Sequence, residues 1–470
     1  MTFATRSATS LLADLASRKL TAEELMGWTL ERIAAVNPPV NAIVGLREGE
    51  DLMAEARAKD AGPISGPLHG LPIAVKDLVE VKGVRSTHGS PIYADLIPEE
   101  DHLLAADLRA AGAILIGKTN VPEFGLGSHT FNPVYGATGN PYAAEFTCGG
   151  SSGGAAVALA TGMTALADGS DMMGSLRNPA GWCNVYGFRP SWGRVPSEPK
   201  GDTFLHQLAT LGPMGRSPED IAVLLDVLSH TDPRQPHGVP SDPIAPLAAA
   251  DLTGKRIGWL ADWGGAYPME DGILSLCEEA MKVFEAQGAV VEQVPPPFDS
   301  EVIWDSWITL RSWQVGAGLA PEKANIDKMK DSARWELERA LSMTALDVHQ
   351  ASLGRTEWFK TATQLFEKYD ALALPTAQVW PFSTDTAWPT EIAGQAMDTY
   401  HRWMEVVLPV SLLGLPSLAM PAGFGANGLP MGVQIFGARG NDASILSLGQ
   451  AYHQATQWPQ NRPAFAGDML

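Results

Sequence analysis

Cysteine is scarce in this chain, which has only Cys148, Cys183 and Cys277 among its 470 residues. Three cysteines give no disulfide framework and no CxxC pair for a metal, and this usage is typical of a reducing compartment. Residues 1–20 also lack the basic start, apolar block and small-residue cleavage site of a secretory signal. We therefore expect a cytoplasmic protein.

Basic charge and long apolar runs are scarce as well. Lys and Arg number 33 against 53 Asp and Glu, which gives a formal net charge of −20. This balance argues against a basic face that grips phosphates, so we expect no nucleic-acid partner. The most apolar stretches, 155–167 and 408–423, are interrupted by Gly, Pro or Ser. They fall short of the roughly 20 apolar residues that span a bilayer, so we expect no membrane span.

The first part of the chain alternates predicted helices and strands. Two helices are predicted within 7–36, the second opened by Thr21 and Glu24 in a capping box. Short apolar runs separated by Gly, Pro and Asn clusters then predict strands, with a helix at 101–112 between two of them. These runs are LPIAV (71–75), AILIG (113–117) and VALATG (157–162). Such alternation indicates an α/β protein.

The second part of the chain supplies further strands after a Pro- and Asp-rich extended connection at about 230–250. Helices are predicted at 272–289 and over most of 303–370. Strands are predicted at 255–262, 289–297, 369–377, 415–424 and 429–437. If these late strands join the early ones in one sheet, the chain is a single domain.

Two motifs suggest chemistry that their surroundings do not favour. GAILIGKT (112–119) matches the phosphate-loop pattern GxxxxGK(S/T), but AILI reads as a strand where a flexible loop is needed, so Lys118 is predicted as a strand-end residue. GGSSG (149–153) matches the GxSxG elbow of α/β-hydrolases, which also needs a downstream acid and histidine. None of the ten histidines has a distinctive context, so this interpretation is an alternative.

Three longer segments fit together in order. They are LHGLPIAVKDL (68–78), CGGSSGGAAVALATG (148–162) and ADGSDMMGSLRNPAGWCNVYGFRPSWGRVP (167–196). In content, order and separation they resemble the amidase signature family, and similar segments continue to about residue 440. The resemblance implies the α/β amidase-signature fold, with one large mixed twisted β-sheet covered by helices on both faces. It implies one amidase domain over 1–470, made of N-terminal helices (1–60), a signature core (about 65–220), a more variable substrate-pocket region (about 290–400) and C-terminal strands and helix (405–460).

The resemblance also implies a Ser–Ser–Lys triad. Ser175 would be the nucleophile, Ser151 the bridging serine after a cis peptide bond, and Lys76 the base. A serine hydroxyl needs a base to remove its proton, and lysine serves only when it is neutral. Because Lys76 follows the apolar run LPIAV, burial that lowers its pKa is plausible from the sequence.

The predicted oxyanion hole departs from the family pattern. Its donors would be the backbone N–H groups of Met172, Met173, Gly174 and Ser175. Met173 stands where the family usually has the first glycine of a Gly–Gly pair, and Asn178 stands where an apolar residue is common. A methionine side chain disfavours a positive φ, so we expect either a differently shaped turn or a crowded acyl pocket.

Three polar residues are predicted to support the triad without taking part in proton transfer. Asp171 and Arg177 match family positions near the nucleophile, where Arg177 can act as a planar donor fork. Ser152 directly follows the bridging serine. We expect these side chains to hold the catalytic loops by hydrogen bonds.

Five further residues are candidates for substrate contact. Thr130 and Asn132 lie in a segment that lines the site in related enzymes. Trp304, Trp307 and Arg311 share one predicted helical face, which would give an aromatic wall and a cation for a carboxylate. The alternative for the tryptophans is ordinary core packing.

These observations predict an amide hydrolase that works through a serine acyl-enzyme and releases ammonia or an amine. The mechanism needs no metal and no organic cofactor, and the expected partner is a small-molecule amide. A homodimer is left open. The alternatives are an amidotransferase-type subunit that delivers ammonia to a partner, a urea- or carbamoyl-type hydrolase, the GxSxG hydrolase and a non-catalytic binding protein.

Overall fold

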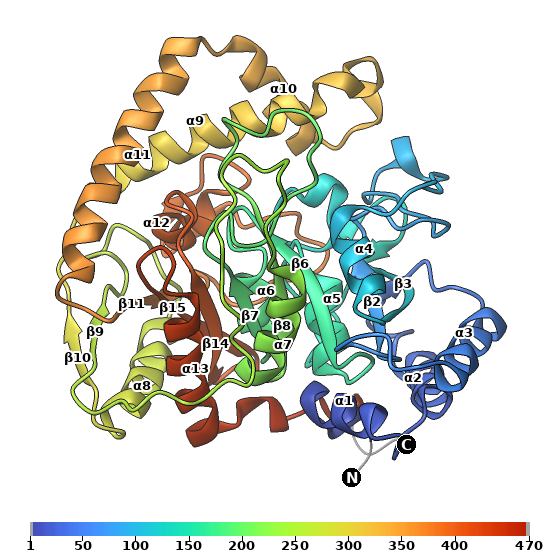
Figure 1. Cartoon of the computed structure of the whole chain (residues 1–470). Coiled ribbons are helices and arrows are strands. Elements are labelled where there is room, and N and C mark those ends of the chain that lie inside the picture. Colours follow the sequence, from blue (N-terminus) through green and yellow to red (C-terminus); the bar gives the residue numbers. More distant parts are fainter. Residues whose placement is uncertain (1–2, 467–470) are drawn as a thin grey trace.

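A mixed sheet of eight strands forms the centre of the computed structural model, which describes residues 3–466 (Figure 1). Across the sheet the order is β10 (Val290–Gln293), β9 (Arg256–Trp259), β11 (Ala371–Pro375), β15 (Pro430–Phe436), β14 (Ser417–Phe424), β7 (Tyr186–Arg189), β8 (Thr210–Gly215) and β6 (Leu166–Asp171). Strand β9 pairs in parallel with β10 and with β11, while the other pairings are antiparallel. The strands of the second part of the chain therefore join β6, β7 and β8 in one sheet, and the predicted α/β class with a large mixed sheet is confirmed.

A second, three-stranded sheet lies beside β6. It consists of β1 (Ile43–Val44), β3 (Ile114–Thr119) and β2 (Pro72–Lys76), in that order. The backbone N–H of Lys76 donates to the side chain of Asp168 on β6 at 3.0 Å, at the point where a continuous sheet would have a backbone carbonyl. The strands predicted at 71–75 and 113–117 are thus present, but a carboxylate links them to the main sheet.

Helices cover both faces of the main sheet, as predicted. On one face, α5 (Gly153–Ala160) and α6 (Arg177–Trp182) contact each other and the strands. On the other, α7 (Pro218–Leu228) and α8 (Ile273–Glu285) both pack against α13 (Asp442–Thr456). Neighbouring side chains on a strand point to opposite faces of the sheet. On β14, Leu418 meets α13 at Gly449, so the next residue, Ala419, points to the opposite face.

The remaining helices surround the two sheets. Near the small sheet lie α1 (Ala8–Ala16), α2 (Ala22–Val36), α3 (Gly49–Ala61) and α4 (Leu103–Ala110). The layer at the top of Figure 1 consists of α9 (Ser300–Leu319), α10 (Asp331–Ser342) and α11 (Ala345–Phe366), and α12 (Leu408–Ser411) lies below it. The short pieces are β4 (Phe131–Asn132), β5 (Gly136–Ala137), β12 (Glu391–Ile392), β13 (Gln395–Ala396), η1 (Phe3–Thr5), η2 (Pro91–Tyr93), η3 (Glu123–Gly125), η4 (Ala320–Lys328), η5 (Arg402–Val407), η6 (Trp458–Gln460) and η7 (Ala464–Ala466).

Local sequence signals account for most of these elements. The capping box of α2 is present, with the Thr21 hydroxyl and the Glu24 carboxylate each meeting the other's backbone N–H. The connection at 230–250 contains neither helix nor strand. The strand predicted at 157–162 is wrong, because these residues belong mainly to α5. That helix is buried on every side, so it lacks the polar stripe that distinguishes a helix from a buried strand. Among residues 3–466 no helix is both long and apolar enough to cross a bilayer.

Candidate active site

The site is built around the amino group of Lys76 at the end of β2. The side chain is fully buried, and its Nζ donates to the hydroxyls of Ser151 at 2.9 Å, Ser152 at 2.8 Å and Ser170 at 2.9 Å. All three hydroxyls are neutral acceptors. The structure therefore brings together the predicted Lys76, Ser151 and Ser152, and it adds Ser170.

Ser170 and Asp168 were missed by the sequence analysis. They alternate on β6, so both side chains point to the side of the strand that faces β2. Asp168 accepts the Lys76 backbone N–H, which fixes the end of β2. The period-two polar pattern of LADGSD in an otherwise apolar strand is the signal that could have found them.

Burial lowers the proton affinity of the Lys76 amino group. Desolvation lowers the pKa of the Lys76 ammonium to about 7, although the charges of Asp168 and Asp171 partly oppose the shift. Desolvation also raises the pKa of Asp168 to about 6. Near neutral pH a large share of Lys76 is thus the free amine, which is the form that can accept a proton.

Ser151 begins the turn into α5, after a cis peptide bond between Gly150 and Ser151 as predicted. Asn178 supports this turn, since its Oδ1 accepts the N–H of Gly150 at 3.3 Å. Gly149 has a φ of +81°, and a Cβ there would lie 2.3 Å from Asn178 Oδ1. The unusual Asn178 therefore contacts the backbone directly before the bridging serine, and only glycine fits opposite it.

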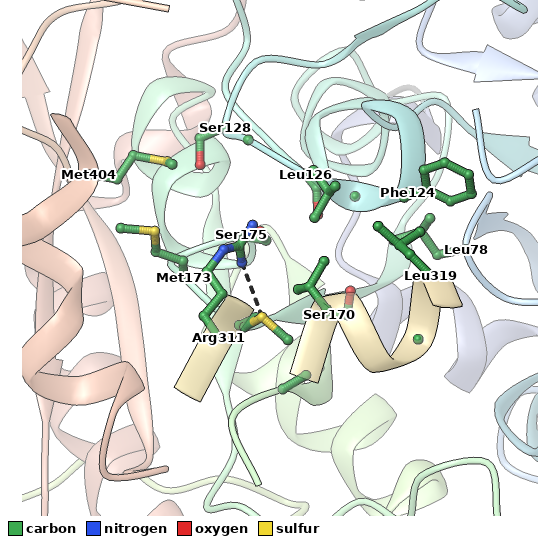
Figure 2. Close-up of a pocket in the computed structure, with 17 residues that line it drawn as sticks. Leu78, Phe124, Leu126, Ser128, Ser170, Met173, Ser175, Arg311, Leu319 and Met404 are labelled. Carbon is green, nitrogen blue, oxygen red and sulfur yellow. Dashed lines mark hydrogen bonds between the residues drawn. The ribbon is translucent and has the colours of Figure 1, made fainter. Parts of the chain in front are cut away.

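Ser175 lines a cavity of about 280 Å³ together with Ser151 and Ser170 (Figure 2). Met172 and Met173 also line this cavity, Figure 2 shows Met173 beside Ser175, and most of the lining is apolar. The backbone N–H of Ser152 donates to the carbonyl oxygen of Ser175 at 3.2 Å, which joins the two serine-bearing loops. The nucleophile candidate and the bridging serine therefore open into one small, mostly apolar space.

The turn before Ser175 has its left-handed residue at Gly174, with a φ of +79°, whereas Met173 is not among the residues with positive φ. Met173 therefore causes no backbone conflict, and its side chain narrows the cavity instead. The Gly174 N–H donates to Asp171 Oδ1 at 2.9 Å, so it is already occupied. Among the described residues no hydrogen bond uses the N–H groups of Met172, Met173 or Ser175. Three of the four predicted oxyanion donors are therefore not engaged in another hydrogen bond of the described residues.

A buried Arg–Asp–Arg group holds this turn. Arg177 contacts Asp171 through Nε at 2.9 Å and Nη2 at 3.0 Å, and Arg189 approaches the same carboxylate at 3.0 Å. Burial alone would raise the pKa of Asp171, but the two guanidinium groups hold it well below its usual range. Asp171 and Arg177 thus contact each other, and Asp171 accepts from the backbone of the turn that bears Ser175. Arg189 was not predicted, because it lies at the end of β7 and is separated from Ser175 in the sequence by α6.

Thr130 and Asn132 do not line the cavity. The Thr130 hydroxyl donates to the carbonyl oxygen of Gly149 at 2.7 Å. Asn132 is buried and uses its amide to join backbone groups, accepting from Val134 and donating to Val121. Both side chains therefore hold loops near the site, and the structure gives them no route to a substrate.

Trp304 and Trp307 do not form the predicted wall of the cavity. Both are buried and pack against the ring of His401, so core packing is the correct interpretation for them. Arg311 does reach the cavity, where Nη1 contacts the sulfur of Met172 at 3.1 Å (Figure 2, dashed line). Its charge is paired with the buried carboxylate of Glu336 at 2.8 Å, so the guanidinium is not free to bind a substrate carboxylate.

The two misleading motifs have structural explanations. Lys118 lies within β3, is buried, and faces Asp77 at 3.9 Å, so the GxxxxGK(S/T) match is a strand and no phosphate loop. Ser151, the serine of the GxSxG match, has Lys76 as its hydrogen-bond donor where a nucleophile elbow needs histidine.

Comparisons with known proteins find similar sequences and structures. The family model described as Amidase matches residues 24–446. An acylamidase from Rhodococcus erythropolis is 32% identical, over 97% of both chains. A glutamyl-tRNA(Gln) amidotransferase subunit from a Roseiflexus species is 33% identical, over 95% of both chains. The crystal structure of a bacterial aryl acylamidase of the amidase signature family superposes with a TM-score of 0.90 at 27% identity, over 97% of this chain and 99% of that one.

Proposed function

Since this chain belongs to the amidase family and hydrolyses amides, we propose that it does so through an acyl-enzyme on Ser175, with Ser151 as the proton relay and Lys76 as the base. The observation that carries this proposal is the environment of Lys76: a buried amine with a pKa of about 7 that contacts three serine hydroxyls. Of those serines, Ser151 and Ser170 line the cavity with Ser175, and Ser151 comes from a separate loop at the start of α5.

The reaction begins with transfer of two protons. Ser151 gives its proton to the neutral Nζ of Lys76 and takes the proton of Ser175, whose oxygen attacks the amide carbon. The carbonyl oxygen becomes an oxyanion, to which the N–H groups of Met172, Met173 and Ser175 can donate hydrogen bonds. When the C–N bond breaks, the proton returns from Lys76 through Ser151 to the leaving nitrogen. Water then attacks the acyl-enzyme by the same relay and releases the carboxylate.

We propose that the chain acts alone as one amidase domain over 1–470, in a reducing compartment such as the cytoplasm, on a small-molecule amide. Strands from both halves share the main sheet, and the three cysteines are unpaired and buried. The similarity to an amidotransferase subunit keeps ammonia delivery to a partner as the second candidate. A urea- or carbamoyl-type substrate is less favoured, because the cavity wall is mainly apolar.

A substrate screen with purified protein tests the proposal. Primary amides, anilides, ureas and acyl-amino acids are incubated with the chain alone, and released ammonia or amine is measured. Release without any partner supports hydrolysis, and mass spectrometry of a quenched reaction should find the acyl group on Ser175. Ammonia release only after a partner protein is added would favour the second candidate. Size-exclusion chromatography of the same preparation reports whether the homodimer forms.

A further inference from the structure

A second cavity lies next to the one that contains Ser175. Its volume is about 560 Å³, twice that of the catalytic cavity, and the two share Leu126, Gly127 and Ser128 as lining residues. Figure 2 shows Leu126 and Ser128 at this shared edge, with Ser175 below them. A volume of this size falls within the range of roughly 300 to 1,000 Å³ that is typical of small-molecule sites. The larger cavity is therefore big enough to hold part of a substrate whose amide lies at Ser175.

The walls of this second cavity are aromatic. Phe131, Trp335, Trp388, Tyr400 and Trp403 line it, and they come from segments far apart in the sequence. We call it the aromatic cavity. Ring faces and edges of this kind favour another planar ring by stacked or edge-to-face contacts, in addition to the apolar area that is buried.

The two cations near the cavities already contact other protein groups. Lys330 lines the aromatic cavity, but its Nζ donates to the carbonyl oxygen of Leu126 at 2.5 Å, and burial lowers its pKa to about 7. Arg311 in the catalytic cavity is held by Glu336 and by the Tyr400 hydroxyl at 2.7 Å. Neither cation is available to a carboxylate, and Asp331 and Asp398 also line the aromatic cavity, so the two spaces disfavour an anionic substrate.

The shared edge lies on the Ser151 side of the catalytic cavity. A Cβ built on Gly125 would be 3.4 Å from the Ser151 hydroxyl, and one built on Gly150 would be 3.3 Å from the backbone of Ser128. In the proposed mechanism Ser151 returns the proton to the leaving nitrogen. The amine side of a bound amide must therefore face this edge, while Met172 and Met173 restrict the acyl side.

From this arrangement we propose that the aromatic cavity binds the amine side of the substrate, so that the chain prefers N-aryl or N-arylalkyl amides with a small uncharged acyl group. The proposal rests on the proposed function, because it uses Ser151 as the proton donor to the leaving nitrogen. It assigns recognition of the leaving group to Phe131 and Trp388, which are only partly buried and come from different segments.

Three amides separate the two sides of the scissile bond. Acetamide has no ring, 4-nitroacetanilide has a ring on the amine side, and benzamide has a ring on the acyl side. In Trp388→Ala and Phe131→Ala we expect the ratio of kcat/KM for 4-nitroacetanilide over acetamide to fall about ten-fold or more, mainly through KM, since truncation removes a ring contact. Ala387→Trp adds bulk to the same cavity at an exposed position and should lower this ratio without opening the core.

Trp380→Ala is the matched control. Trp380 is also a partly buried tryptophan, but it lines a different cavity with Asp271 and Phe424, and its loss should leave the ratio unchanged. Circular dichroism and thermal unfolding check that each variant is folded. If the three variants reduce the benzamide-to-acetamide ratio and spare 4-nitroacetanilide, the aromatic cavity holds the acyl side and the proposal is wrong. Unchanged ratios in all three folded variants also overturn it.

A binding measurement keeps this result separate from the proposed function. Calorimetric titration of 4-nitroacetanilide into Ser175→Ala, with and without Trp388→Ala, needs no turnover. Loss of affinity of about ten-fold in the double variant supports the aromatic cavity even if the chain hydrolyses none of the three amides, in which case only the proposed mechanism fails. Equal affinity in both proteins overturns the cavity assignment.

Discussion

Lys76 and Lys118 are two buried lysines on paired strands, and they differ in what surrounds the ammonium group. Val75 pairs with Lys118 and Lys76 with Thr119, so the lysines are close neighbours in the small sheet. Burial lowers the pKa of both, to about 7 for Lys76 and about 8 for Lys118. Lys118 faces the carboxylate of Asp77 and the carbonyl of Val79, whereas Lys76 contacts three hydroxyls.

The difference shows that burial alone does not make a catalytic base. A carboxylate and a carbonyl can only accept from an ammonium, so the proton on Lys118 has no onward path. A serine hydroxyl both accepts and donates, and it can therefore pass a proton between Lys76 and a substrate. By this argument Lys118 supports the fold and Lys76 supports the chemistry.

The largest expected effect comes from removal of the Ser175 hydroxyl, whose proton passes to Lys76 in the proposed mechanism. Ser175→Ala should lower kcat by about 10⁴-fold or more, because loss of a nucleophile removes the covalent route. The midpoint of thermal unfolding should stay close to that of the parent, since the Ser175 hydroxyl has a cavity on one side. Steady-state kinetics and calorimetry measure both. Retained turnover would exclude Ser175 as the nucleophile.

Substitution of each lysine by methionine tests the comparison itself. Lys76→Met should reduce kcat/KM by roughly 10³-fold, within the range of about 10² to 10⁴ for a lost general base. Lys118→Met leaves Asp77 buried without its cation, so it should cost about 3 kcal/mol or more of unfolding free energy while the folded fraction stays active. Urea unfolding and rates per folded molecule separate the two effects. Similar losses of rate in both variants would remove the distinction between the lysines.

Ser170→Ala sharpens the account of the Lys76 environment. The Ser170 hydroxyl accepts from the Lys76 ammonium at 2.9 Å, which favours the charged form. Its loss should lower the pKa of Lys76 by about one unit, because a hydrogen bond to a charged group contributes about 1.5 kcal/mol or more. The pH profile of kcat/KM should shift to lower pH by that amount, with a rate loss of about ten-fold or less. A shift to higher pH would contradict the assigned contact.

The smallest expected effect concerns Met173, whose side chain lines the catalytic cavity. Met173→Gly should enlarge the acyl side and raise the benzamide-to-acetamide ratio of kcat/KM by about five- to ten-fold, as expected for a few atoms removed from an apolar pocket. The contacts of Lys118 with Asp77 and Val79 should be unaffected. An unaltered ratio in a folded variant would remove Met173 from the acyl pocket.

The resemblance carried by LPIAVKD, GGSSG and MMGSLR predicts which residues gather at the site, and in the structure Lys76 ends a strand while Ser151 precedes a helix. The alternating polar residues of LADGSD mark Ser170 as unusual for a buried strand, but its contact with Lys76 depends on how β6 lies against β2. The contact of Arg189 with Asp171 likewise depends on how β7 lies in the sheet, which no local pattern encodes. Trp304 and Trp307 were placed on the correct helical face, but only the tertiary contact with His401 decides that this face is covered.

The most direct test of a neutral Lys76 is the pH dependence of covalent modification of Ser175 by phenylmethylsulfonyl fluoride, a reagent that needs no knowledge of the natural amide. Only the free amine can take the proton of Ser175 through Ser151, so the rate should fall as pH drops through the Lys76 pKa of about 7. We predict a single transition near that pH in the parent and in Lys118→Met, and its loss in Lys76→Met. A rate that is flat between roughly pH 5.5 and 9, or a transition that survives in Lys76→Met, would contradict the account.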